Sequence, residues 1–161
     1  MIFFTSFIFT LLLAHIARAA PACDDVASSQ VLYDDTEQSF LTTYKVTWDA
    51  TYDNPEGNTL GVACSNGPHG LAAKYPHFRN FPDFPFLGGA FDTKFGSPNC
   101  GKCWKLTDKT SRRFIYFTAI DASGSFNIGK RAFTALNGGT VGSGTLEAEA
   151  TPVPGHFCGF K

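Results

Sequence analysis

The chain has 161 residues, of which 43% are hydrophobic and 15% aromatic, and its formal net charge is −1. This length suits one domain with its own core. The nearly balanced charge, with no broad basic stretch, argues against nucleic acid as a partner.

The first residues form an apolar run that ends in small side chains. Residues 2–13 are mostly apolar and lead to Ala17-Arg18-Ala19-Ala20, the pattern of a secretory signal peptide, although the usual positive start is missing. We expect cleavage after Ala19, which makes residues 1–19 the signal. The run is too short to span a membrane, which takes about 20 residues. We therefore predict a secreted protein, extracellular or in the cell wall, with no membrane span.

Residues 20–43 differ in composition from the rest of the chain. They are acidic and polar, with Asp24-Asp25 and Asp34-Asp35, and offer few side chains for a core. We expect an exposed and mostly disordered extension. Cys23 lies in this stretch and is the natural unpaired cysteine, free or linking two copies. Residues 44–161 form the predicted domain.

The domain reads as short strands separated by Gly, Pro and Asn turns, which is typical of an all-β barrel or sandwich. In chain order, the predicted strands are Tyr44–Trp48, Leu60–Cys64, Gly88–Phe91, Cys103–Thr107, Phe114–Ile120 and Thr145–Ala150. Two short helices are predicted over Gly70–Tyr75 and Ile128–Leu136, the second from its apolar spacing and the Gly138 that follows it.

Five cysteines follow the predicted cleavage site, and in an oxidising compartment they are expected to pair. By itself, Cys100-Gly101-Lys102-Cys103 also indicates a redox centre or half of a zinc site. However, no second close pair of Cys or His completes a zinc site. Trp104–Thr107 alternates as a strand, whereas a redox motif opens a helix. We therefore expect disulfides and neither metal nor cofactor, and the spacing leaves the pairing open.

The most specific motifs lie around these cysteines and after the strongest strand. They are Val62–Leu71 with Cys64-Ser65-Asn66-Gly67, Phe81–Gly89, Ser97–Trp104, Ala119-Ile120-Asp121 with Gly124–Asn127, and the late Cys158. In this order they resemble the cerato-platanin family of small secreted fungal proteins. The resemblance spans about Tyr44 to Cys158, nearly the whole predicted domain.

The resemblance implies a mainly β fold: a six-stranded double-psi β-barrel, similar to expansins, with two or so short helices. It implies two disulfides, Cys64–Cys100 and Cys103–Cys158. It also implies a non-enzymatic wall-loosening protein that binds chitin oligomers in a shallow groove, self-assembles at surfaces and elicits plant defence. The expected partners are therefore chitin oligomers or another cell-wall polysaccharide, a plant host receptor and further copies of the chain.

Asp121 matches the acidic groove residue of expansin-like barrels, and Asp49 matches an acidic residue after the first strand. The expected carbohydrate-binding residues are Asp121, Asp49, Ser65, Asn66, Gly67, Gly124, Phe126 and Asn127, with Trp48 and Tyr52 as further stacking aromatics. A plainer interpretation makes Asp121 and Asp49 turn residues that accept backbone N–H bonds.

Two alternatives to non-hydrolytic binding remain open from the sequence. A glycoside hydrolase needs two carboxylates roughly 5–5.5 or 6.5–9.5 Å apart, here Asp121 and Asp49. A surface-active protein needs an exposed apolar patch, for which Phe78–Phe91 with its five phenylalanines is the candidate. The plainer interpretation, which we prefer, is that this segment is a loop that packs its rings on a small core.

Overall fold

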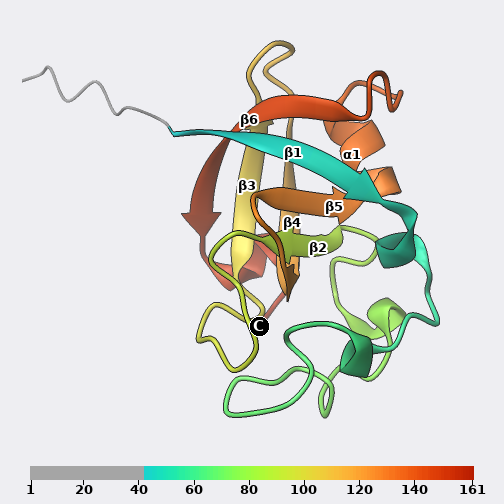
Figure 1. Ribbon diagram of the computed structural model, residues 1–161, viewed down its shortest axis with the longest axis vertical. Coiled ribbons are helices and arrows are strands. Elements are labelled where there is room, and N and C mark those ends of the chain that lie inside the picture. The colour runs from blue at the N-terminus through green and yellow to red at the C-terminus, as the bar shows by residue number, and fades with distance from the viewer. Residues whose placement is uncertain (1–41) are drawn as a thin grey trace, which may run out of the picture. The chain divides into compact units, whose positions relative to one another are not determined.

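The computed structural model describes residues 42–161, which form a closed barrel of six strands in the order β1-β5-β2-β4-β3-β6 (Figure 1). The strands are β1 (Thr43–Asp49), β2 (Leu87–Ala90), β3 (Cys103–Asp108), β4 (Phe114–Ala122), β5 (Phe126–Gly129) and β6 (Thr145–Val153). The helices are α1 (Lys130–Leu136) and the 3-10 turns η1 (Ala50–Asp53), η2 (Thr59–Gly61), η3 (Phe78–Asn80) and η4 (Gly155–Cys158). The predicted mainly β, six-stranded barrel is confirmed.

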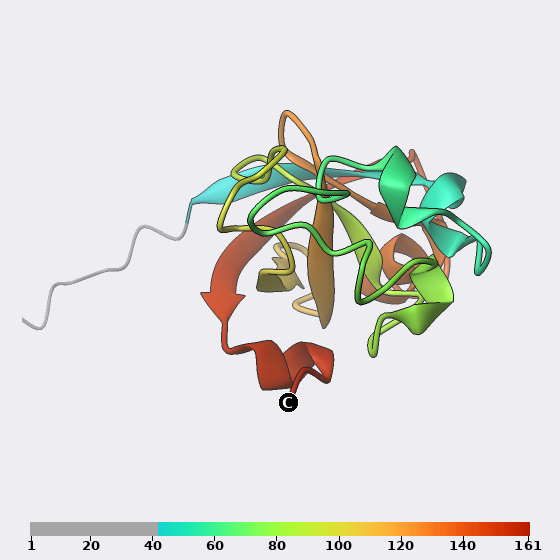
Figure 2. The same cartoon turned by 90° about the horizontal axis from the view of Figure 1, so that it is seen from below.

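The barrel brings together strands that are far apart in the chain. β1 runs parallel to β5 and antiparallel to β6, and β2 runs parallel to β4 and antiparallel to β5. β3 completes the ring between β4 and β6, antiparallel to both. Figures 1 and 2 show the long connection from β1 to β2, with η1, η2 and η3, lying outside the ring of strands.

Two apolar clusters hold this arrangement. The larger fills the barrel with alternate strand side chains and one face of α1, including Val46, Leu106, Phe117, Phe126, Ile128 and Phe133. The smaller lies on the outer side of the barrel wall, where Tyr52, Phe78 and Phe81 of the β1–β2 connection pack on Leu87 of β2 and Ile120 of β4. Burial of these rings is what fixes the long connection against the barrel wall.

Two predicted elements are wrong. Leu60–Cys64 is not a strand, because Asn58 accepts a hydrogen bond from the Leu60 N–H (2.9 Å) and starts η2. Gly70–Tyr75 forms turns rather than a helix, because the N–H groups of Leu71 and Ala72 donate to the carbonyls of Cys64 and Ser65. One α-helix is therefore present in residues 42–161, where two were expected.

A short strand was missed. β5 occupies Phe126–Gly129, so the helix expected from Ile128 begins only at Lys130. Ile128 pairs with Trp48 in β1 and with Gly88 in β2. Its side chain enters the barrel core, which explains why its spacing also suited the buried face of a helix.

Both disulfides have the pairing that the resemblance implied. Cys64–Cys100 joins the β1–β2 connection to the segment before β3, and Cys103–Cys158 joins β3 to η4, with Cα–Cα distances of 5.4 and 5.9 Å. The predicted signal peptide, Cys23 and nearly all of the predicted extension lie outside the described residues. β1 begins at Thr43, the last residue assigned to that extension.

Candidate functional site

Asp121 lies near the end of β4, where three elements meet. Its Oδ1 accepts hydrogen bonds from the N–H groups of Ala63 (2.9 Å) and Ala122 (2.8 Å), and its Oδ2 accepts one from the Tyr52 hydroxyl (3.0 Å). The side chain is half-buried. Asp121 thus fastens η1 and the Ala63 loop to the barrel, while each oxygen keeps part of its acceptor capacity.

A β-bulge turns Asp121 outward. Leu87 and Gly88 pair with Thr118 and Ala119, but Gly89 pairs with Asp121, so Ile120 is the extra residue of β4. Strict alternation after Phe117 and Ala119, which face the core, would point Asp121 into the barrel. One inserted residue reverses the face, and bulges of this kind commonly re-aim a functional side chain.

This turn completes a row of polar positions across four neighbouring strands. Thr47 of β1 pairs with Asn127 of β5, Asn127 pairs with Gly89 of β2, and Gly89 pairs with Asp121 of β4. The Thr47 hydroxyl donates to Asn127 Oδ1 (3.0 Å). We call Thr47, Asn127, Gly89 and Asp121 the polar row. The structure therefore brings the predicted residues Asp121 and Asn127 together, and adds Thr47 and Gly89, which the sequence did not single out.

The predicted loop Ser65-Asn66-Gly67 follows Ala63, which Asp121 anchors. The Cys64 N–H donates to the Ile120 carbonyl (3.0 Å), so the loop starts beside the end of the polar row. Asn66 and Gly67 are exposed, and Ser65 is half-buried. A Cβ placed on Gly67 would come 3.7 Å from the ring of Phe95, whose side chain is 65% exposed. The Cys64–Cys100 disulfide holds these two loops together.

Phe95 is a candidate that sequence reasoning missed. An exposed flat ring beside polar groups is suited to stacking on a sugar ring. Its sequence neighbours, Lys94 and Gly96, carry no motif that distinguishes it from the other phenylalanines. The Cys64–Cys100 disulfide, which joins residues 36 apart, connects the loop of Phe95 to the loop of Gly67.

The aromatic residues expected to stack are mostly inside. Phe126 is 1% exposed and packs against Trp104 and Phe117, so its ring belongs to the core. Tyr52 is 6% exposed and contributes its hydroxyl rather than its ring face. Burial, followed by the nearby charge of Asp121, raises the pKa of Tyr52 above its usual range, so the phenol stays a donor. Trp48 is half-buried, with Lys130 Nζ 5.1 Å from its ring centroid.

The other predicted residues lie at the edges of this region. Asp49 is exposed at the end of β1, and its Oδ1 accepts from the Thr51 N–H (2.8 Å), which makes it the N-cap of η1. Gly124 is exposed in the turn between β4 and β5, with open space where a side chain would stand. Asp49 thus has the turn role that the plainer interpretation gave it.

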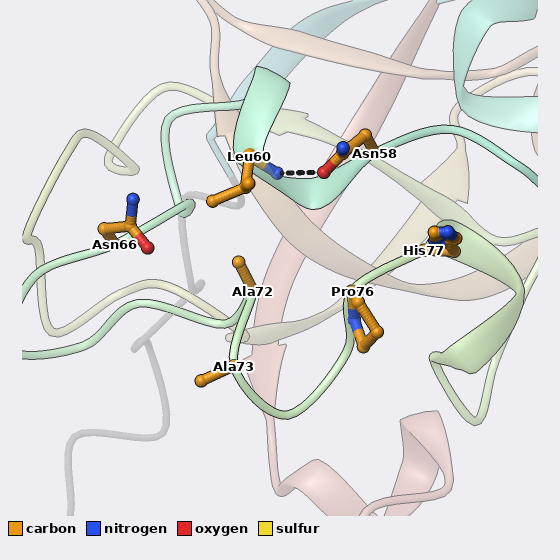
Figure 3. Close-up of a pocket in the computed structure, with 7 residues that line it drawn as sticks. All are labelled: Asn58, Leu60, Asn66, Ala72, Ala73, Pro76 and His77. Carbon is orange, nitrogen blue, oxygen red and sulfur yellow. Dashed lines mark hydrogen bonds between the residues drawn. The ribbon is translucent and has the colours of Figure 1, made fainter.

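A small hollow adjoins Asn66 (Figure 3). Its volume is about 280 Å³, and the side chains around it are Asn58, Leu60, Asn66, Ala72, Ala73, Pro76 and His77. Figure 3 shows Leu60 and Ala72 lying between Asn66 and His77. The walls combine methyl groups with two amides. The hollow therefore extends the surface beside the Asn66 loop with a mixed lining.

The described part of the chain contains neither a metal centre nor a membrane-spanning helix. Across residues 42–161, no group of three or more His, Cys, Asp or Glu side chains is placed to hold a metal ion. No helix in that range is long and apolar enough to cross a bilayer.

Comparison with known proteins gives a consistent result. The family model described as cerato-platanin matches residues 44–160. The heat-stable 19 kDa antigen of Coccidioides posadasii is 38% identical over 123 residues, which cover 74% of this chain and 83% of that protein. The crystal structure of cerato-platanin 1 from M. perniciosa is 37% identical, covers 71% of this chain and 98% of its own, and superposes with a TM-score of 0.68.

A second solved structure agrees. The solution structure of the fungal elicitor cerato-platanin is 35% identical, covers 71% of this chain and 95% of its own, and has a TM-score of 0.65. The closed barrel and the two disulfides agree with these matches. The chain belongs to the cerato-platanin family, whose members are secreted and non-enzymatic.

Proposed function

We propose that the domain binds cell-wall polysaccharide, chitin oligomers foremost, without hydrolysing it, and so loosens or remodels the wall. The observation that carries this proposal is the polar row, which presents Thr47, Asn127 and Asp121 side by side across β1, β5 and β4. A neutral sugar chain needs hydrogen-bonding groups and flat surfaces rather than a strong electric field, and the row with Phe95 offers both.

The proposed binding mode uses the side-chain groups that still have free hydrogen-bonding capacity. Asp121 accepts through the unused capacity of its oxygens, and the Asn127 and Asn66 amides both donate and accept. Phe95 stacks on a pyranose face. Each bond to a sugar hydroxyl replaces a bond between neighbouring chains of the wall, so loosening requires no covalent step.

The positions of the carboxylates favour binding over hydrolysis. Asp121 holds three protein donors, and Asp49 caps η1. A hydrolase needs one of the pair to protonate the glycosidic oxygen and the other to attack or to activate water. Here both carboxylates have structural partners.

We place this activity outside the cell. Residues 1–19 act as the secretory signal, and the two disulfides suit an oxidising compartment. One solved relative is described as a fungal elicitor. By analogy we propose that this protein, acting at a plant surface, elicits defence through a host receptor.

The test is titration of the oxidised protein with chitin oligomers, with reducing-end release assayed on the same samples. We expect binding without release. Asn66→Ala and Asn127→Ala should each weaken affinity several-fold, since each removes an amide that both donates and accepts. Thr151→Ala, an exposed change on β6 outside the row, is the matched control and should bind like the natural protein. Release of reducing ends would make the domain a hydrolase, and equal affinity in all variants would remove the polar row from the site.

Surface activity is a second candidate function. The exposed apolar side chains support it, but most of them lie outside the segment that the sequence suggested. Phe78 and Phe81 are 2% and 3% exposed, so the segment Phe78–Phe91 is mostly core rather than an adsorbing patch. Among residues 42–161, the exposed large apolar side chains are Phe91, which ends this segment, and Leu60, Phe95, Phe114 and Phe157, which lie outside it. We expect Phe114→Ser with Phe157→Ser to raise surface tension toward that of buffer, with no loss of chitin affinity.

A further inference from the structure

A second and larger cavity lies away from the polar row. Its volume is about 570 Å³, within the range of small-molecule sites. It opens among the segment before β2, strand β4 and η4, and its lining includes Asp83, Phe84, Phe86, Phe114, Tyr116 and Phe157. None of these residues belongs to the polysaccharide surface proposed above.

The walls of this cavity are mainly aromatic. Phe114 and Phe157 are 54% and 45% exposed, so a part of each ring is accessible to a ligand. Tyr116 joins them: it stacks on Phe157 with a centroid distance of 4.9 Å and meets Phe114 edge-on at 5.7 Å. The face of an aromatic ring carries negative charge density and attracts a cation.

Asp83 supplies a carboxyl group to the same cavity. The Thr118 hydroxyl donates to Asp83 Oδ2 (2.6 Å), while the buried Oδ1 has no hydrogen-bond donor among residues 42–161. Burial away from water raises the pKa of Asp83 to about 7. The hydrogen bonds from Thr118 lower this pKa, but by less than burial raises it. Above neutral pH the fold therefore holds a buried negative charge with an unpaired oxygen, which is costly unless a positive charge accompanies it.

Among the described residues, no positively charged side chain forms an ion pair with Asp83. Tyr116 is the other titratable residue of the lining, and within the described range no Lys, Arg or His belongs to it. Lys105 and His156 lie against the lining rings: Lys105 Nζ is 4.5 Å from the Phe114 centroid, and the His156 ring is 4.4 Å from that of Phe157. Lys105 shows that one of these rings already accepts a cation on its face.

We propose that this cavity binds a small organic ammonium cation, held by the rings of Phe114, Tyr116 and Phe157 and balanced by the carboxylate of Asp83. Aromatic rings with a carboxylate are the groups that recognise substituted ammonium ions. The same chemistry is found in an arylalkyl ammonium ion and in the protonated glucosamine units of a deacetylated wall polysaccharide. The first joins a positive nitrogen to an aromatic ring, and the second joins it to a pyranose with an apolar C–H face.

The experiment is calorimetric titration of the oxidised full-length protein. Benzyltrimethylammonium serves as the permanent cation and benzyl alcohol as the neutral probe. We expect the cation to bind at least tenfold more tightly than the alcohol at pH 8. If only ionised Asp83 binds it, a group with a pKa of about 7 makes the affinity about thirtyfold higher at pH 8 than at pH 5.5. Equal binding of the two probes would overturn the proposal.

Variants separate the two halves of the site. Asp83→Asn keeps an acceptor for Thr118 and should remove both the preference for the cation and its pH dependence. Phe157→Ala should weaken the cation several-fold and leave the pH dependence in place. Glu147→Gln, an exposed carboxylate outside the cavity, should change neither. A pH profile unaltered by Asp83→Asn, with the fold intact by near-ultraviolet circular dichroism, would overturn the assignment.

Competition identifies the source of the cation. Displacement of benzyltrimethylammonium by a glucosamine trimer, but not by an N-acetylglucosamine trimer, supports the site and assigns an amino sugar to it. Binding of benzyltrimethylammonium that neither trimer displaces supports the site for arylalkyl ammonium ions. Displacement by both trimers alike would show that charge is not recognised and would overturn the proposal.

Discussion

Asp121 has a structural role in the fold, and the proposed function gives the same side chain a binding role as well. Its carboxylate accepts hydrogen bonds from Tyr52, Ala63 and Ala122. A half-buried donor that loses its acceptor costs roughly 1–3 kcal/mol. We therefore expect Asp121→Ala to lower the free energy of unfolding by about 2–4 kcal/mol, and Asp121→Asn by clearly less, in urea denaturation.

The two substitutions also separate the roles of Asp121. Asp121→Asn keeps a carbonyl acceptor, so its effect on chitin affinity reports binding more cleanly than that of Asp121→Ala. If Asp121→Ala is as stable as the natural protein, the three hydrogen bonds contribute nothing to the fold, and Asp121 acts in binding alone.

Asp83 makes stability depend on pH with an unusual sign. Its folded pKa of about 7 lies above the ordinary 3.8, so the folded state binds a proton that the unfolded chain has released. The free energy of unfolding should therefore fall as pH rises from about 4 to 7, by up to about 4 kcal/mol from this group. Asp83→Asn should flatten this slope and be more stable than the natural protein at pH 8. Urea denaturation at pH 4, 6 and 8 measures the slope, and an unchanged slope in the variant would contradict the assignment.

At the residue scale, the sequence indicated which side chains to consider for the candidate site better than it indicated the face of the strand to which each one points. Asp121 and Asn127 were predicted for the site and do lie in one row. Phe126 was predicted beside them but faces the core. The reason is that successive residues of a strand point to opposite faces. Phe126 and Asn127 are adjacent in β5, so only one of them can face outward. The bulge at Ile120, which sets the phase of Asp121, has no local signal in the sequence.

Among the elements, β2 packs unusually close to β5. A Cβ on Gly88 would lie 2.5 Å from the Asn127 carbonyl oxygen and 2.7 Å from Ile128 Cα, both backbone atoms. We expect Gly88→Ala to force the strands apart and cost more than about 2 kcal/mol. Gly124→Ala is the matched control, because nothing lies within 4 Å of its Cβ position. Thermal unfolding of both variants checks this, and equal melting temperatures would show that β2 and β5 can separate without cost.

The strands found from sequence are the four long ones and the short β2, which was predicted one residue late at each end. β1, β3, β4 and β6 each have six or more residues and were predicted within a few residues of their bounds. β5 has four residues, too few for a pattern. Leu60–Cys64 is apolar enough for a strand, but its N–H and C=O groups bond to turns and to Ile120 instead. Apolar composition thus indicated burial there without determining the backbone conformation.

At the scale of the whole molecule, two disulfides tie the barrel to its surrounding loops. The bridged cysteines are 36 and 55 residues apart in sequence. In the chain-entropy treatment, closing a loop of this size stabilises the folded state by about 4 kcal/mol. We expect Cys64→Ala/Cys100→Ala and Cys103→Ala/Cys158→Ala each to lose stability of that order in urea. Chitin affinity should fall in the first variant alone, since only that bridge holds the Asn66 loop beside Phe95.

The order of the strands could not be derived from local patterns, because parallel pairs such as β1 with β5 join residues about 80 apart. The resemblance supplied the six-stranded barrel as the expected fold, and the structure adds the order of its strands. Local physics accounts for the strands and the turns, whereas the topology depends on contacts that form only when the domain is complete.

Within residues 42–161, the ring of six strands has no open end: each strand has hydrogen-bonded neighbours on both sides. A sheet with a free edge can add a strand from another molecule and grow into a fibril, and this barrel offers no such template. If copies assemble at an interface, we expect them to meet through exposed side chains such as Phe91 and Phe95 rather than through main-chain amides. Layers built in this way would consist of folded domains and would disperse when the apolar contacts weaken.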